Sequence, residues 1–197
     1  VLRSQIAHGR IRSIDTKPAL RMPGVHSVIT AADIGSPVPT VNIRLQPMPS
    51  LVPFQRPVMA HGKVRYVGEP IALVLADSVE MAEDAANAIE VDIDPLPVIT
   101  DRHASARDET LLFERHGSNQ PVKYTAVLGD ATSAFRNAPY IRREQFRVNR
   151  HAAVPMEPRG LLAEWDESKG RLTLHGAAKV AFFNRRMLAE KLGLAED

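Results

Sequence analysis

The sequence predicts an α+β fold, and three observations support this prediction. Residues 71–76 form an uninterrupted apolar run, I-A-L-V-L-A, which is typical of a central buried strand. Residues 79–89 follow with apolar side chains at helical spacing, and residues 91–95 then alternate apolar and acidic side chains. The apolar residues 161–163 lead into the polar turn D-E-S-K-G, and residues 171–175 after it alternate apolar and polar side chains, which predicts a β-hairpin. Helices and strands are therefore mixed along the chain.

Composition narrows the class of protein. The 197 residues suffice for one large or two small domains, and the net charge of +2 gives weak support for an anionic partner. The absence of cysteine excludes disulfides, thiolate zinc sites and iron–sulfur ligation within these residues. No apolar run approaches the ~18 residues of a membrane helix, and no secretory leader opens the sequence. We expect a cytoplasmic protein without a membrane span.

The first hundred residues predict short strands and helices. Thr16 caps a short helix that ends at Leu20, and Asp77 or Ser78 caps the helix over 79–89. The proline-rich, nearly acid-free segment 35–57 predicts a long loop, either a surface excursion or a partner-docking arm. Strands are expected within residues 1–15, 25–30, 63–67, 71–76 and 91–95.

The second part begins after a polar, irregular stretch. We expect a first domain over residues 1–104, a linker over 105–127 and a second domain over 128–197. In the second domain Asp130 caps a short helix, and a long strand covers residues 140–150. After the hairpin, a helix covers residues 180–192 and ends at Gly193.

Motifs for several chemistries are missing. The sequence has no glycine-rich phosphate loop, and its seven histidines never fall at i, i+3 or i+4, so we expect no metal site. Glu157, between Pro155 and Pro158, is either a general base or the partner of Arg159, and the ion pair is preferred. A basic stripe on the 140–150 strand indicates a solvated sheet face rather than nucleic-acid binding; it consists of Arg142, Arg143, Arg147 and Arg150.

Several short segments follow one another along the chain and include P-G-V at 23–25, V-R-Y-V-G-E-P at 64–70, G-D at 129–130, M-E-P-R-G at 156–160 and A-E-W-D at 163–166. In this order they resemble the large subunit of the molybdenum hydroxylases, the family of xanthine dehydrogenase, aldehyde oxidase and aerobic carbon monoxide dehydrogenase. The resemblance implies an α/β-hammerhead domain followed by the truncated start of a molybdopterin-binding α+β domain.

The resemblance also implies a function for the intact protein. It would be a bacterial oxidoreductase that hydroxylates or oxidises carbon monoxide, an aldehyde or an N-heterocycle at a molybdopterin centre, and the resemblance implies the cytosine dinucleotide form of the cofactor. Iron–sulfur clusters and FAD are expected on partner subunits or domains. The family's catalytic glutamate lies far downstream, so this segment should contain no catalytic residue, bind no cofactor and be inactive alone.

One cofactor-binding position of the family falls inside the chain. Family members read Ser/Thr-Thr-Gln-x-Pro-His after the hairpin, and the glutamine donates a hydrogen bond to an oxygen ligand of molybdenum. This sequence reads A-A-K-V-A-F at 177–182, which puts Lys179 at the glutamine position. An ammonium group also donates, but it adds a full charge and cannot accept. The alternative is therefore a non-catalytic binding or assembly module of the same fold.

Overall fold

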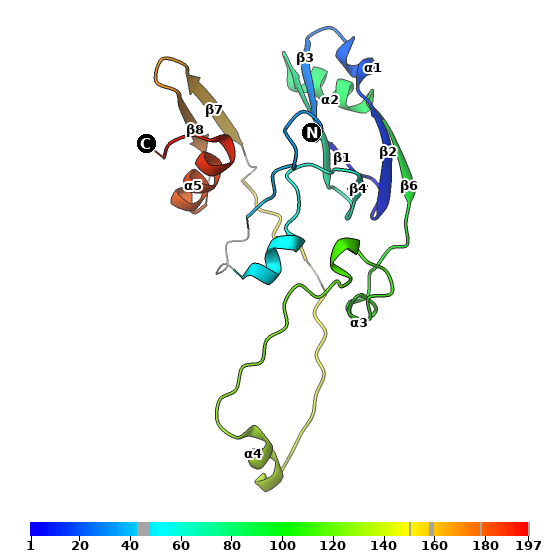
Figure 1. Cartoon of the computed structure of the whole chain (residues 1–197), viewed down its shortest axis with the longest axis vertical. Helices are drawn as coiled ribbons and strands as arrows, with labels where there is room; N and C mark the ends of the chain where they lie inside the picture. The colour runs from blue at the N-terminus through cyan, green and yellow to red at the C-terminus, as the bar shows by residue number, and fades with distance from the viewer. Residues whose placement is uncertain (43–47, 150, 158–159, 178, 197) are drawn as a thin grey trace. The chain divides into compact units, whose positions relative to one another are not determined.

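The computed structural model describes residues 1–42, 48–149, 151–157, 160–177 and 179–196 (Figure 1). The chain forms two compact units, Val1–Lys123 and Tyr124–Asp197. The predicted mixture of helices and strands is confirmed in both units.

The first unit contains two three-stranded antiparallel sheets. In one sheet β5 (Pro70–Ala76) lies between β1 (Leu2–Arg3) and β3 (Val25–Thr30). In the other, β2 (Gly9–Asp15) lies between β4 (Lys63–Val64) and β6 (Glu90–Pro95). Helix α2 (Val79–Asn87) connects β5 to β6 and therefore joins the two sheets.

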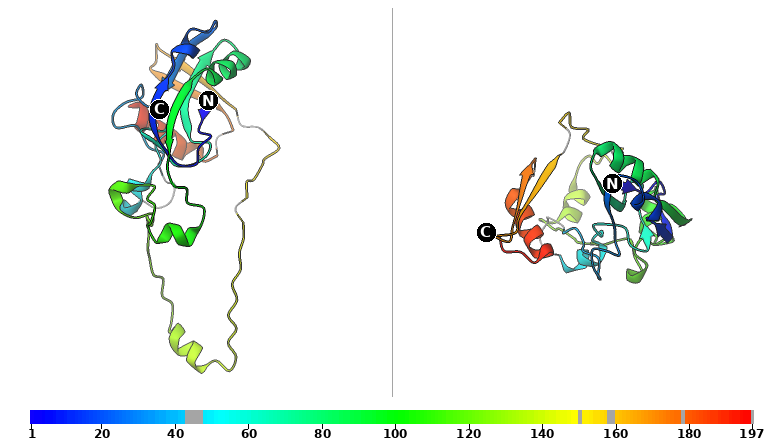
Figure 2. Two further views of the ribbon diagram at one scale, coloured as in Figure 1. Left: turned by 90° about the vertical axis from the view of Figure 1, so that its right-hand side faces the viewer. Right: turned by 90° about the horizontal axis from the view of Figure 1, so that it is seen from above.

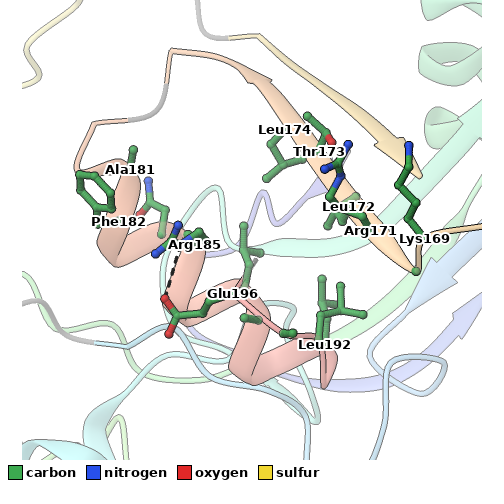
Figure 3. A pocket seen from close by; sticks show the side chains of 16 residues that line it. Lys169, Arg171, Leu172, Thr173, Leu174, Ala181, Phe182, Arg185, Leu192 and Glu196 are labelled. Carbon is green, nitrogen blue, oxygen red and sulfur yellow. Dashed lines mark ion pairs between the residues drawn. The ribbon is translucent and has the colours of Figure 1, made fainter. Parts of the chain in front are cut away.

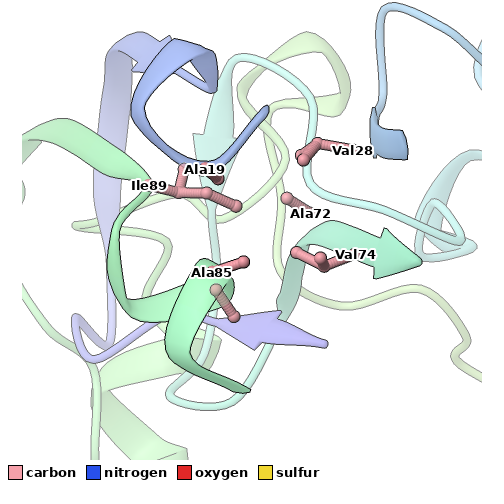
Figure 4. Packing of buried hydrophobic residues seen from close by; sticks show 7 residues of the cluster. Ala19, Val28, Ala72, Val74, Ala85 and Ile89 are labelled. Atoms are coloured by element: carbon pink, nitrogen blue, oxygen red, sulfur yellow. The ribbon is translucent and has the colours of Figure 1, made fainter. Parts of the chain in front are cut away.

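The main hydrophobic core lies where β3 and β5 meet α1 (Lys17–Leu20) and α2. Its buried members are mostly small, which lets the helices approach the sheet closely; they are Ala19, Val28, Ala72, Val74, Ala85, Ala86 and Ile89 (Figure 4). The central position of β5 is confirmed, but its burial is one-sided. Leu73 and Leu75 point away from this core and are 36% and 43% exposed. An apolar run alone does not show whether elements cover both faces of a strand.

Local side-chain hydrogen bonds explain where elements begin and end. Ser78, not Asp77, caps α2, because its Oγ accepts from the backbone N–H of Met81 (3.3 Å). The strand expected over 63–67 covers only two residues. The backbone N–H of Arg65 donates to the carboxyl of Glu69 (2.5 Å), so β4 cannot continue its ladder through this group.

The stretch after β6 is more ordered than its polar composition suggests. It contains α3 (Arg102–Ala106), capped by Asp101, and the 3₁₀ turn η2 (Glu114–His116). Another 3₁₀ segment, η1 (Pro49–Phe54), lies in the proline-rich loop. We call residues 107–119 the connecting segment; it belongs to the first unit.

The second unit contains α4 (Ala131–Asn137), the hairpin of β7 (Leu161–Asp166) and β8 (Arg171–Gly176), and α5 (Ala181–Leu192). The predicted cap of α4 is confirmed, since Asp130 Oδ1 accepts from Ser133 N (2.9 Å). The strand predicted over 140–150 is wrong for residues 140–149, and residue 150 lies outside the described residues. Figure 2 shows this stretch extended and without a neighbouring strand, so its backbone has no ladder to join.

Candidate functional site

The β-hairpin sets the position of the chain that follows it. Its strands pair in register from Leu161↔Gly176 to Asp166↔Arg171. Asp166 closes the turn by accepting from Ser168 Oγ (2.6 Å) and from Lys169 Nζ (2.8 Å). The hydrogen bond from Lys169, followed by that from Ser168, holds the pKa of the Asp166 carboxyl below its ordinary value. The Asp166 carboxyl therefore stays ionised at neutral pH and keeps its hydrogen bonds across the turn.

Gly176 ends the hairpin where only glycine fits. Its φ of +138° is rarely adopted by L side chains, and a Cβ there would collide with the carbonyl oxygen of Gly160, the residue just before β7. The chain then reaches Lys179 and Val180, and Val180 has left-handed backbone angles (φ 60°, ψ 55°) at the start of α5. A β-branched residue in this region is strained, which marks the β8–α5 connection as unusual.

Lys179 is exposed at this connection, and its backbone is fixed. Its carbonyl oxygen accepts a hydrogen bond from Asn184 Nδ2 (2.9 Å), one turn into α5. Helix α5 begins two residues after Lys179 and has no side-chain cap, so backbone N–H groups of its first turn remain as donors in addition to the Lys179 ammonium. These groups only donate, and the helix end adds partial positive charge. The donor set therefore fits an anionic oxygen.

A groove between β8 and α5 is the feature that sequence analysis missed (Figure 3). It has a volume of about 780 Å³, and its apolar lining includes Leu172 and Leu174 from the strand and Leu188 and Leu192 from the helix. Its only sequence signal is the alternation of β8 together with the apolar spacing of α5. Arg185 and Glu196 form an ion pair at the groove (3.4 Å). Lys179 is not among its lining residues, so the two features are separate.

The other residues singled out in the sequence do not form a site with Lys179. Glu157 is exposed, and its expected partner Arg159 lies outside the described residues. Arg142 pairs with Glu144 on the unpaired 140–149 stretch. Among the described residues, no group of three or more histidine, aspartate or glutamate side chains is placed to hold a metal ion, and no helix has the length and apolarity to cross a membrane.

Family models match both parts of the chain. Residues 1–97 match the a/b hammerhead domain of aldehyde oxidase and xanthine dehydrogenase, and residues 113–197 match the molybdopterin cofactor-binding domain. The gamma subunit of the 6-hydroxypseudooxynicotine dehydrogenase complex of Paenarthrobacter nicotinovorans is 36% identical over 199 residues, which include 100% of this chain and 25% of that protein. The large chain of carbon monoxide dehydrogenase of Hydrogenophaga pseudoflava is 33% identical over 211 residues, which include 100% of this chain and 26% of that protein.

Solved structures give the same result. Quinoline 2-oxidoreductase from Pseudomonas putida 86 has a TM-score of 0.85 and 30% sequence identity over 99% of this chain and 25% of that chain. The chain thus spans about a quarter of the length of these relatives. Both matched domains lie in the order that the sequence predicts. The chain belongs to the molybdenum hydroxylase large-subunit family, and it carries the α/β-hammerhead domain followed by the start of the molybdopterin-binding domain.

Proposed function

We propose that the complete protein is a molybdenum-dependent oxidoreductase that hydroxylates a small molecule. The observation that carries this proposal is the ordered match of both domains, at residues 1–97 and 113–197. Among its described residues, the hammerhead domain has no group of three or more histidine, aspartate or glutamate side chains placed to hold a metal ion.

An aromatic N-heterocycle is the substrate class that we propose. The relatives that match nearly the whole of this chain include a nicotine 6-hydroxylase large subunit, at 33% identity, and quinoline 2-oxidoreductase. Both names specify an N-heterocycle. Carbon monoxide and aldehydes are the other classes named among the relatives. A substrate panel separates these three classes.

The proposed cofactor is molybdopterin, in the cytosine dinucleotide form. When bound, such a group supplies a Lewis-acidic metal with an oxygen ligand. Lys179 Nζ, with the first backbone N–H groups of α5, would donate to that oxygen and stabilise negative charge on it. We further propose iron–sulfur and FAD partner subunits. The word "complex" in the name of the gamma-subunit relative supports partner subunits in general. A cytoplasmic location is proposed from the sequence analysis alone.

The non-catalytic module remains the second candidate because of Lys179. An exposed lysine at a helix start is an ordinary surface residue, and its charge replaces the neutral glutamine that the family resemblance implies. In this candidate the fold is retained for binding or assembly without molybdenum chemistry.

Turnover by the complete protein with its partner subunits tests the proposal. Quinoline, nicotine, benzaldehyde and carbon monoxide should be offered separately, with an artificial dye as electron acceptor. We expect dye reduction with a heterocycle. Turnover only with carbon monoxide or the aldehyde would contradict the substrate class but keep the enzyme, whereas reduction with none of the four would favour the module.

A further inference from the structure

Strand β4 presents opposite sides to two different environments. Val64 is completely buried beside Ala60 and Ile71 in the second hydrophobic cluster. Lys63 and Arg65 alternate with it and face the connecting segment. Lys63 Nζ donates to the carbonyl oxygen of Leu111 (3.2 Å) and to Glu114 Oε1 (2.7 Å). The connecting segment is therefore held on β4 by a nearly buried lysine.

Arg65 is shared between the connecting segment and the interior. Its guanidinium lies 5.1 Å from the ring centroid of Phe113, within the range of a cation–π contact. Its Nη1 lies 3.7 Å from Glu69 Oε1, a distance too long for a hydrogen bond. Phe113 in turn packs edge-on against Phe54 of η1, with centroids 5.3 Å apart. The Phe113 ring thus contacts both the Arg65 guanidinium and η1, which lies in a loop distant in sequence.

Glu69 lies on the inner side of Arg65 and is incompletely satisfied. Its side chain is 1% exposed, and Oε2 accepts from the backbone N–H of Arg65. Oε1 has no hydrogen-bond partner among the described residues. Burial raises the pKa of this carboxyl, and the hydrogen bond and charge of Arg65 together with the charge of Arg56 only partly oppose it.

We propose that Glu69 and Arg65 form a proton-sensitive clasp that determines how firmly the connecting segment, residues 107–119, is held on β4. With Glu69 neutral, its carboxyl attracts the Arg65 guanidinium only weakly, and Arg65 stays over the Phe113 ring as observed. With Glu69 ionised, the buried carboxylate attracts Arg65 into a direct ion pair and away from Phe113. The connecting segment then loses one of its contacts with β4.

The sign of the pH effect follows from the raised pKa of Glu69. The clasped state binds the proton more tightly than the state in which the carboxylate pairs directly with Arg65, because that ion pair lowers the pKa of the Glu69 carboxyl. The stabilisation is therefore complete where Glu69 is protonated in both states, and it is lost as the pH rises through the higher pKa of the clasped state. Exchange from the connecting segment should increase with pH in this window.

Other charged groups near the clasp behave differently. Burial is the largest influence on Glu114 and opposes its ionisation. The hydrogen bond from Lys63, a backbone hydrogen bond and the charges of Lys63 and His8 together outweigh burial and lower the Glu114 pKa, so this pair weakens only in acid. The remaining groups that face the clasp are Arg56, Tyr66, His8 and His116. A pH effect that arises from His8 or His116 would survive the neutral substitution Glu69→Gln.

Hydrogen–deuterium exchange of the complete protein, read peptide by peptide from about pH 5 to about pH 8, tests the clasp. After correction for the intrinsic pH dependence of exchange, peptides from 107–119 should exchange faster with rising pH in the wild type, by up to about tenfold per pH unit. Glu69→Gln should remove this dependence, and Glu109→Gln, an exposed acid in the same segment, should retain it. Peptides from 71–93 serve as the internal reference.

Three outcomes would overturn the proposal: a flat wild-type profile, a pH dependence that persists in Glu69→Gln, or its loss in Glu109→Gln. Should Glu69→Gln fail to fold, Phe113→Leu provides an independent test. It removes the ring over Arg65 and keeps an apolar side chain beside Phe54. Exchange of 107–119 in Phe113→Leu should be fast and lack the wild-type slope, and retention of that slope would equally contradict the clasp.

Discussion

The side chain of Asn119 satisfies three backbone groups of the connecting region, which has no strand ladder there. Its Oδ1 accepts from Leu112 N (2.9 Å), and its Nδ2 donates to the carbonyl oxygens of Thr110 (2.7 Å) and Ser105 (3.2 Å). The backbone N–H of Asn119 donates to Asp108 Oδ1 (2.6 Å). One amide thus gives residues 105–119 a defined path despite their polar composition.

Asn119→Ala should loosen this region strongly. Three lost hydrogen bonds at about 1 kcal/mol each, partly replaced by water, amount to about 2 kcal/mol, or roughly 30-fold faster hydrogen exchange of residues 105–119. Asn137→Ala is the matched control, because its amide makes one long, exposed contact with Ser133 (3.4 Å). Equal exchange in both variants would show that Asn119 does not organise the segment.

Lys179→Gln tests the proposed donor to the cofactor. Loss of the ammonium exchanges a charge-assisted hydrogen bond for a neutral one, so we expect kcat of the complete enzyme to fall by about tenfold with an altered pH profile. Its folding stability should change by only about 0.5 kcal/mol, since the residue is exposed. Lys123→Gln removes the same charge from the first unit and should leave kcat unchanged. Equal kcat and pH profiles for wild type and Lys179→Gln would exclude this role.

At the scale of elements, sequence patterns predict the parts whose stability is local. The cap of α4 at Asp130, the hairpin turn at Asp166 and the glycine stop at Gly193 are confirmed, because each depends on residues within one turn. Long-range features are not predicted. The 140–149 strand lacks a neighbour, and Glu69 ends β4 through a side chain five residues past that strand. Lys179 was identified from a resemblance, but the groove beside β8 depends on the packing of α5.

Ser78→Ala should destabilise α2 by about 1 kcal/mol, because the N–H of Met81 loses its acceptor. Ser78→Asp retains an acceptor, and its negative charge interacts favourably with the positive N-terminal end of the helix dipole. This variant should therefore lose little stability. Thermal or denaturant unfolding of the two variants, followed by hydrogen exchange in residues 79–89, measures the difference. Equal destabilisation by alanine and aspartate would show that this cap contributes nothing.

At the scale of the whole molecule, the two units differ in how far their large apolar side chains are buried. The stretch that follows Lys123 exposes large apolar side chains, including Tyr124 at 81% and Leu128 at 99%. Limited proteolysis of this 197-residue segment should therefore cleave first within 124–130 or 138–149 and leave a stable product close to residues 1–123. First cleavage inside 71–93 or 107–119 would contradict this division.

The measurement that tests the central claim most directly is the molybdenum and pterin content of the complete protein, purified with its natural partner subunits. The proposed enzyme should contain about one molybdenum and one pterin per large subunit, because the cofactor carries the chemistry. A control preparation from cells unable to make the cofactor should contain neither. A well-folded, correctly assembled complex from normal cells that lacks molybdenum and pterin would contradict the enzyme and favour the non-catalytic module.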